Sequence, residues 1–116
     1  MTSRGIGAIK PGTGVIYFAA YRDFDNETHI KVGCTAQKVS TRLRCVFNPK
    51  EYSLLATVPG DGDLESLIHE RLRDSRVRSH FGRYPSKERF RPTPDVLAVC
   101  GAAMRGPSAL AEELAR

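Results

Sequence analysis

Hydrophobic and polar positions alternate in two stretches near the start of the chain. Residues 15–21 read Val-Ile-Tyr-Phe-Ala-Ala-Tyr, and residues 29–34 read His-Ile-Lys-Val-Gly-Cys. β-Branched and aromatic residues at a period of two favour β-strands, and the polar residues 23–26 favour a turn between them. Residues 52–58 are predicted as a further short strand. The pattern therefore predicts a hairpin followed by a third strand.

The same period sorts the hairpin into two faces. The apolar face holds Ile16, Phe18, Ile30 and Val32. The alternate positions hold Tyr17, Tyr21, His29 and Lys31. If the strands pair in ordinary register, the second set lines one polar face together. We expect this polar face to be open as a cleft, with His29 at the surface, and it is the first candidate site.

Apolar residues at helical spacing predict two helices in the middle of the chain. The first is capped by Thr35, runs to about residue 47 and includes Arg42 at the border of its apolar stripe. The second begins near Asp63, with Asp61 or Asp63 as its N-cap. Its predicted buried face consists of Leu64, Leu67, Ile68 and Leu72.

Two more helices are predicted towards the end of the chain. Thr93 followed by Pro94 is typical of a cap with proline in the first helical position, and this helix should extend to about Met104. The Gly106-Pro107 pair ends it. Residues 108–116 are then predicted as a short terminal helix.

With 116 residues the chain has the size of one domain. The predicted fold class is α/β, with a small antiparallel three-stranded β-sheet flanked by α-helices. Residues 1–13, which contain three glycines and a proline, are interpreted as a flexible N-terminal arm. The domain itself is assigned to residues 14–105, and residues 106–116 to a helical tail.

Composition narrows the functional classes. The chain is 41% hydrophobic and 27% charged, which is ordinary for a globular protein, and no apolar run is long enough to span a membrane. The first residues lack the apolar region of a secretory signal, so a cytoplasmic location is expected. Three cysteines without metal-ligand spacing indicate neither a disulfide framework nor a zinc site. A net charge of +5 favours an anionic partner.

Charged residues gather in two places along the chain. Glu65, His69 and Arg73 recur every four residues and therefore stack on one helix face. Eight lysines and arginines lie between Arg71 and Arg91, a density that favours a nucleic-acid contact. The predicted substrate contacts are Arg44, Arg76, Arg78 and Lys87.

The order of several short motifs resembles the GIY-YIG nuclease superfamily. The motifs are Val15-Ile16-Tyr17, Lys31-Val32-Gly33, Arg42-Leu43, Glu65 and His69. The resemblance covers roughly residues 14 to 100 and is closest to a phage and bacterial branch whose second motif begins with lysine instead of tyrosine. Glu88-Arg89-Phe90 stands where that branch commonly has Glu-Trp-Phe.

This resemblance implies a metal-dependent endonuclease that hydrolyses DNA, with RNA left open as a substrate. It implies one divalent cation, Mg²⁺ or Mn²⁺, held by Glu65, because such ions prefer oxygen ligands. Arg42 would stabilise charge on the phosphate, and Tyr17 would accept a proton from the attacking water. Lys31 would supply the positive charge that a weakly basic phenol needs, and His69 would carry a proton or contact the phosphate.

Two further residues are assigned supporting roles, and the partners stay open. Gly33 ends the second strand, and Glu88 would orient Arg42 or Lys31. No sequence-reading module is evident, so we expect targeting by a partner protein or by a larger parent protein. No membrane partner is expected, and the oligomeric state is undetermined.

Each of these residues also has a plain structural interpretation. Tyr17 taken alone is a half-buried strand tyrosine, Arg42 a solvated helix arginine, and Glu65 a carboxylate favoured near a helix N-terminus. One rival hypothesis is therefore a nucleic-acid-binding domain of the same fold without catalysis. The other is a compact helix-rich regulator that reads bases with residues 35 to 47.

Overall fold

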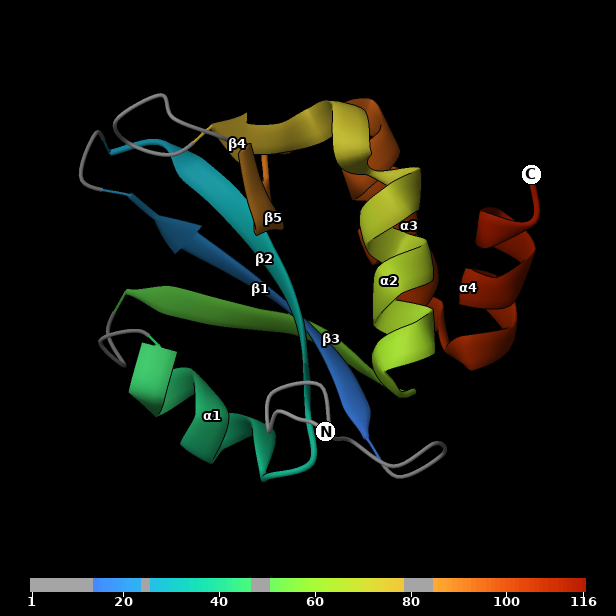
Figure 1. Cartoon of the computed structure of the whole chain (residues 1–116), viewed down its shortest axis with the longest axis horizontal. Coiled ribbons are helices and arrows are strands. Elements are labelled where there is room, and N and C mark those ends of the chain that lie inside the picture. Colours follow the sequence, from blue (N-terminus) through green and yellow to red (C-terminus); the bar gives the residue numbers. More distant parts are fainter. Residues whose placement is uncertain (1–13, 24–25, 47–50, 79–84) are drawn as a thin grey trace.

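The fold is built on one antiparallel β-sheet of five strands. The computed structural model describes residues 14–23, 26–46, 51–78 and 85–116, so the predicted arm at residues 1–13 lies outside the described residues. Figure 1 shows the sheet at the centre with helices on both sides. The strands are β1 (Val15–Arg22), β2 (Thr28–Thr35), β3 (Tyr52–Pro59), β4 (Arg76–Arg78) and β5 (Pro85–Phe90).

The spatial order of the strands is β3, β1, β2, β5 and β4. The predicted hairpin is confirmed, since β1 and β2 pair antiparallel with Tyr17 opposite Gly33 and Tyr21 opposite His29. The third predicted strand is also confirmed as β3, which pairs with β1 through a register shift between Phe18 and Ala19. This central hairpin is the scaffold on which the candidate residues are placed.

The prediction of a three-stranded sheet was wrong, because β4 and β5 extend the sheet beyond β2. Phe90 pairs with Ile30 and Arg89 with Lys31, and β4 then adds to β5. Both strands fall within the arginine-rich segment, which has no regular alternation of apolar residues. Pairing with a preformed strand, and the burial of Phe90 to 0% exposure, determine the strand conformation here.

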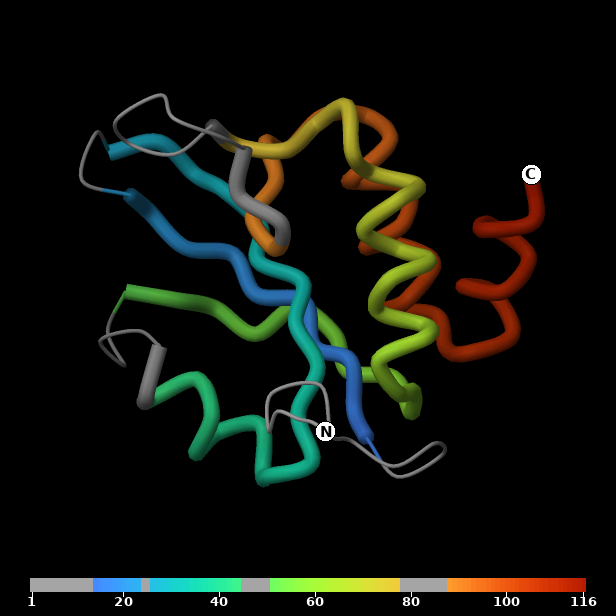
Figure 2. Tube along the Cα trace, viewed as in Figure 1, coloured from blue at the N-terminus to red at the C-terminus, as the bar shows by residue number. Residues whose placement is uncertain are grey.

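Two helices cover one face of the sheet, a third packs on their outer side, and all three contribute to the main core. They are α2 (Gly62–Arg71), α3 (Pro94–Arg105) and α4 (Pro107–Leu114). The trace in Figure 2 shows α4 on the outer side of α2 and α3. The predicted apolar face of the hairpin lies in this core with Ile68 and Leu72 of α2, Val96 and Val99 of α3, and Leu110 of α4. Leu67, which was predicted to be buried, is instead 54% exposed.

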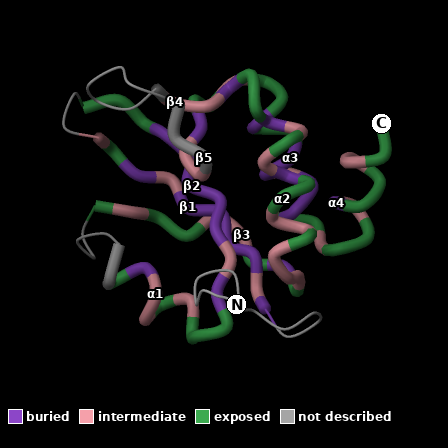
Figure 3. The backbone as a smooth tube through the Cα atoms, in the orientation of Figure 1, coloured by how far each residue is buried: buried purple, intermediate pink, exposed green. Residues whose placement is uncertain are grey.

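The opposite face of the sheet carries a smaller core against helix α1 (Val39–Val46). Leu43 of α1 packs on Tyr17 and Ala19 of β1, with Val39 and Tyr52 at the margin. The expectation of an open polar cleft was therefore wrong for these positions, because the candidate face is largely covered. Exposure falls to 0% for Tyr17, 4% for Lys31 and 5% for His29, which was expected at the surface. Figure 3 shows this burial along β1 and β2.

The helix starts depend on local capping. Asp61 caps α2 by accepting hydrogen bonds from the backbone N–H groups of Asp63 and Leu64, and Thr93 caps α3 ahead of Pro94. Thr35 does not cap α1, because its hydroxyl accepts from the Gln37 N–H in a turn and the helix starts four residues later. A small polar residue before a helix can close a local turn instead of capping.

The terminal helix α4 starts at Pro107, directly after Gly106, whose φ of 124° favours glycine. Arg71 of α2 donates to the backbone oxygen of Glu113 and pairs with its carboxylate at 3.2 Å, which ties α4 to the domain. Among the described residues, the helices are all too short or too polar to cross a membrane. The fold is thus α/β. Its five-stranded sheet excludes the helix-rich fold that the regulator hypothesis assumes.

Candidate active site

Tyr17 reaches across the sheet over Gly33. The two residues are opposite each other on β1 and β2, and a Cβ atom at position 33 would overlap the phenol ring and its hydroxyl. Glycine at this position is therefore required for the observed placement of the tyrosine. The Tyr17 hydroxyl is buried and has no hydrogen-bond partner among the residues that the structure describes. An unsatisfied buried hydroxyl is costly, so its presence calls for an explanation.

Lys31 lies next to Tyr17 on the same face. Its Nζ atom is 5.4 Å from the centre of the Tyr17 ring and 2.6 Å from Oε1 of Glu88. Burial opposes the charge on Glu88, but the hydrogen bond and charge of Lys31, together with other nearby positive charges, outweigh it and lower the pKa of this carboxyl. Glu88 reaches Lys31 because β5 pairs with β2 at Arg89, the next residue. Of the two supporting roles predicted for Glu88, contact with Lys31 is the one seen.

Glu65 lies at the part of the β2 edge that β5 leaves free. In the described part of the chain, β5 pairs with β2 at Ile30 and Lys31 only. Further along β2, the Glu65 carboxylate accepts a hydrogen bond from the backbone N–H of Cys34. Gly33, over which the Tyr17 phenol passes, is the neighbouring residue. The carboxylate and the phenol therefore approach the same two-residue segment of β2 from α2 and β1.

The charge environment of Glu65 is unusual. Burial raises the pKa of the Glu65 carboxyl, and the nearby Glu88 carboxylate raises it further. Lys31, Arg42 and the Cys34 hydrogen bond oppose this shift without cancelling it. The charged form of Glu65 is therefore disfavoured, and any additional positive charge beside it would stabilise that form.

His69 follows Glu65 by one turn of α2 and contacts the same strand edge. Its Nε2 atom lies 2.9 Å from the backbone oxygen of Val32, and because a carbonyl only accepts, Nε2 is the donor. Burial lowers the pKa of His69, which favours the neutral ring at pH 7. The Glu65 oxygen is 3.8 Å from Nε2, beyond hydrogen-bond range. The observed contact of His69 therefore fastens α2 to β2.

Arg42 approaches the group from α1 on the other side. It is half-buried, and Leu43 beside it is fully buried against Tyr17. Its positive charge acts on both Glu65 and Glu88. Five predicted residues are thus brought together with Glu88. This group, called the Tyr17 cluster below, contains Tyr17, Lys31, Arg42, Glu65, His69 and Glu88.

The predicted substrate-binding residues differ in their surroundings where the structure describes them. Arg44 is exposed on α1, whereas Arg76 is half-buried and donates to the backbone oxygen of His69. The side chains of Arg78 and Lys87 lie outside the described residues. Other arginines of the basic segment are engaged within the protein, such as Arg73 with Glu70 at 2.6 Å and Arg91 with the backbone oxygen of Asp74.

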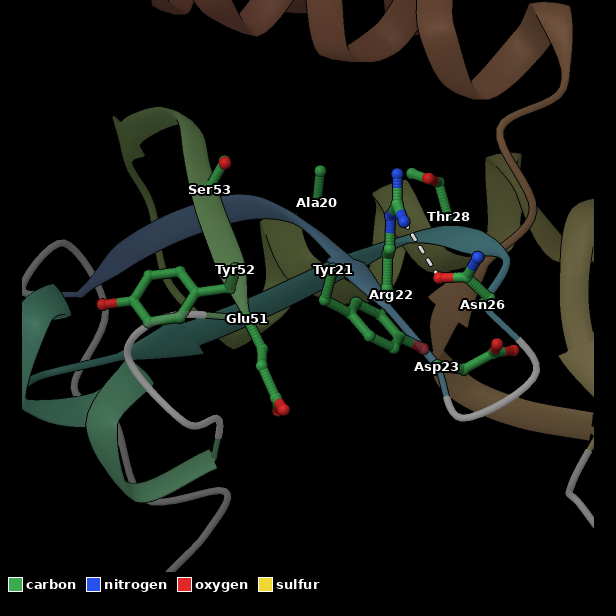
Figure 4. A pocket seen from close by; sticks show the side chains of 9 residues that line it. All are labelled: Ala20, Tyr21, Arg22, Asp23, Asn26, Thr28, Glu51, Tyr52 and Ser53. Carbon is green, nitrogen blue, oxygen red and sulfur yellow. Dashed lines mark hydrogen bonds between the residues drawn. The ribbon is translucent and has the colours of Figure 1, made fainter.

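A cleft that the sequence did not indicate lies at the far end of β1. It has a volume of about 510 Å³. It is lined by Ala20, Tyr21, Arg22, Asp23, Asn26, Thr28, Glu51, Tyr52 and Ser53. Figure 4 shows Arg22 hydrogen-bonded to Asn26 at its rim. Tyr21 is four residues from Tyr17, roughly 13 Å along a strand. The cleft is therefore separate from the Tyr17 cluster, and only packing of β3 against the hairpin creates it.

The contact between Lys31 and Glu88 gives a testable dependence of stability on pH. Because the folded-state pKa of Glu88 is below its ordinary 4.5, the stabilisation is present above that pH and is lost as pH falls through the folded value. Glu88→Gln should lower the free energy of unfolding by about 1 kcal/mol at pH 7, discounted because Glu88 is partly exposed.

Chemical denaturation of both proteins between about pH 3 and pH 7 measures this difference. The two curves should converge at the acidic end, where Glu88 is protonated. Glu70→Gln, at an exposed pair on α2, serves as the control and should change little. A difference that is the same at both ends of the range would contradict the assignment.

Comparison with known proteins identifies the family. No curated protein and no solved structure matches the chain. The T5orf172 domain matches residues 14–104, which is most of the chain. This match corrects the GIY-YIG assignment, which depended on motifs of two or three residues that are each weak alone. The chain belongs to the T5orf172 domain family.

Proposed function

We propose that this protein is a metal-dependent endonuclease that cleaves DNA at the Tyr17 cluster. Membership of the T5orf172 family supports a nucleic-acid-related role and is consistent with endonuclease activity. The observation that carries the proposal is that a phenol from β1 and a carboxylate from α2 approach one segment of the β2 edge, while the charge of Arg42 on α1 acts on that carboxylate. A net charge of +5 suits a polyanionic substrate.

The residues present fit a divalent cation at Glu65. The carboxylate is partly exposed, and its raised pKa reflects burial and the neighbouring Glu88 charge, which a cation would offset. Glu65 is also held in place by the Cys34 N–H, as a ligand on a rigid element should be. A bound Mg²⁺ or Mn²⁺ would neutralise charge on the scissile phosphate and the leaving oxygen.

Arg42 and Lys31 have different proposed roles. Arg42, with a planar fork of donors, is proposed to hold phosphate oxygens and to stabilise the charge that develops on them. Lys31, which lies beside the Tyr17 ring, is proposed to stabilise negative charge that develops on the phenol oxygen during the reaction. The Tyr17 hydroxyl, which lacks an internal partner among the described residues, would relay a proton: its oxygen would take one from the attacking water while its own proton passes to solvent. His69 and Glu88 would hold α2 and Lys31 in position.

One observation favours the rival without catalysis. Tyr17 is 0% exposed, so a substrate cannot contact its phenol unless α1 or a neighbouring segment moves. A domain that binds nucleic acid through exposed arginines such as Arg44 would need no such movement. DNA binding without hydrolysis is therefore the second candidate function.

Incubation of the protein with supercoiled plasmid separates the two functions. The proposal expects nicked or linear product with MgCl₂ or MnCl₂, none with EDTA, and binding that weakens as salt rises. The same assay on single-stranded DNA and on RNA defines the substrate class. Salt-dependent binding of every substrate with no hydrolysis in any divalent metal would establish the rival instead.

A further inference from the structure

A second group of metal-ligating side chains lies at the end of the β1 and β2 hairpin, apart from the Tyr17 cluster. Asp23 follows β1, Glu27 precedes β2, and His29 is the second residue of β2. One ligand atom from each residue can be chosen so that all three lie within 4.8 Å of one another. The three come from seven consecutive positions, and antiparallel pairing of the hairpin brings them together.

His29 is the most informative member of this group. Its side chain is only 7% exposed, and its Nδ1 atom is buried without a hydrogen-bond partner in the described part of the chain. Tyr21 contacts the ring edge-on, with 5.8 Å between ring centres, which limits rotation. A buried imidazole nitrogen that lies near a carboxylate oxygen and makes no hydrogen bond to the described residues suits coordination of a cation.

The spacing between His29 and Asp23 fits metal coordination. Nδ1 of His29 and Oδ2 of Asp23 are 3.2 Å apart, but their directions do not make a hydrogen bond. Two ligand atoms at ~2.0–2.1 Å from one tetrahedral ion lie roughly 3.3 Å apart. The observed pair is therefore separated as two ligands of one ion would be.

The two carboxylates differ in how they are held. Oδ1 of Asp23 accepts the backbone N–H of Glu27 at 3.0 Å, which orients Oδ2 towards His29. Glu27 is 73% exposed, and its Oε1 lies 3.8 Å from Nε2 of His29, so its long side chain can adjust to an ion. A ligand fixed by a backbone hydrogen bond is a usual feature of metal sites in proteins.

We propose that Asp23, Glu27 and His29 form a zinc-binding site that fastens the end of the hairpin. One imidazole nitrogen with two carboxylate oxygens suits Zn²⁺ better than Mg²⁺, which prefers oxygen ligands alone. Three protein ligands leave a fourth tetrahedral position for water. The site is independent of the proposed nuclease reaction, since Tyr21 already lies four residues beyond Tyr17 on β1.

Isothermal titration of the untagged full chain with ZnCl₂ tests the proposal, in a Glu65→Gln background that removes the other candidate ligand. This parent protein should bind one equivalent of zinc, and its midpoint of thermal unfolding should rise by several degrees with zinc and fall again with EDTA. Titration with Co²⁺ should give the visible absorption of a tetrahedral complex.

Single substitutions in the same background locate the ion. Glu27→Gln changes an exposed side chain, so the fold should persist while the Kd for zinc rises at least about tenfold. Asp23→Asn should weaken binding similarly, and His29→Gln should abolish it. Glu112→Gln, at an exposed carboxylate on α4, is the matched control and should leave the Kd unchanged. A parent that binds no zinc, or Kd values for Glu27→Gln and Asp23→Asn equal to the control, would overturn the proposal.

Discussion

Replacement of Glu65 by glutamine is expected to reduce DNA hydrolysis at least about a thousandfold while leaving the fold intact. The amide oxygen can still accept the Cys34 N–H, so the contact between α2 and β2 persists. The negative charge that would hold a cation is lost. Charge stabilisation by a metal ion is worth several kcal/mol, and each 1.4 kcal/mol is a factor of ten in rate.

Single-turnover cleavage of a labelled duplex in MgCl₂ and in MnCl₂ measures this loss. Glu70→Gln is the matched control, since Glu70 is on the same helix but pairs with Arg73 at the exposed surface. DNA affinity should not fall in the Glu65 variant, because a negative charge has been removed. The unfolding midpoint should stay the same or rise, since burial and Glu88 already disfavour the Glu65 charge. Cleavage within about threefold of the control would remove Glu65 from the mechanism.

Tyr17→Phe is expected to slow DNA cleavage without lowering the stability of the fold. Removal of a proton acceptor should slow cleavage by about 10²–10⁴-fold. Stability should not decrease, and a gain of about 1 kcal/mol is expected, because the hydroxyl is buried without a partner among the described residues. The ring itself, packed against Leu43 and Gly33, is unchanged.

Chemical denaturation and single-turnover cleavage of the same preparations test both halves. Tyr52→Phe, on the same sheet face at the margin of the α1 core, controls for the loss of a phenol outside the Tyr17 cluster. It should cleave at the wild-type rate. A clear drop in stability for Tyr17→Phe would mean that its hydroxyl has a structural partner, and full activity would exclude it as the proton acceptor.

Much of the central hairpin could be predicted because its chemistry is local. Alternation at a period of two determines which side of β1 and β2 each residue faces, so Tyr17 and Lys31 were expected together and lie together. The caps at Asp61 and Thr93 depend on side chains that reach only two or three residues along the chain. Such signals survive folding because distant residues do not compete with them.

The outer half of the sheet could not be predicted in the same way. β4 and β5 contain arginine, lysine and glutamate at positions where an isolated strand gains nothing from burial. The strand conformation of β5 depends on hydrogen bonds to β2 and on the burial of Phe90, and that of β4 depends on pairing with β5; all of these exist only after the hairpin has formed. The contact of Glu88 with Lys31 follows from that pairing, 57 residues apart in the chain.

By itself the sequence determined the hairpin, its two faces and the caps of α2 and α3, because each depends on residues within a few positions. Only the tertiary structure decided where the pairing of β5 with β2 ends. It ends beside Lys31, so that His69 and Glu65 contact the edge of β2 at residues 32–34. The tertiary structure also decided that α1 covers the face that the alternation had marked as open. Burial and charge at these positions depend on distant segments packing together, and no local pattern encodes that packing.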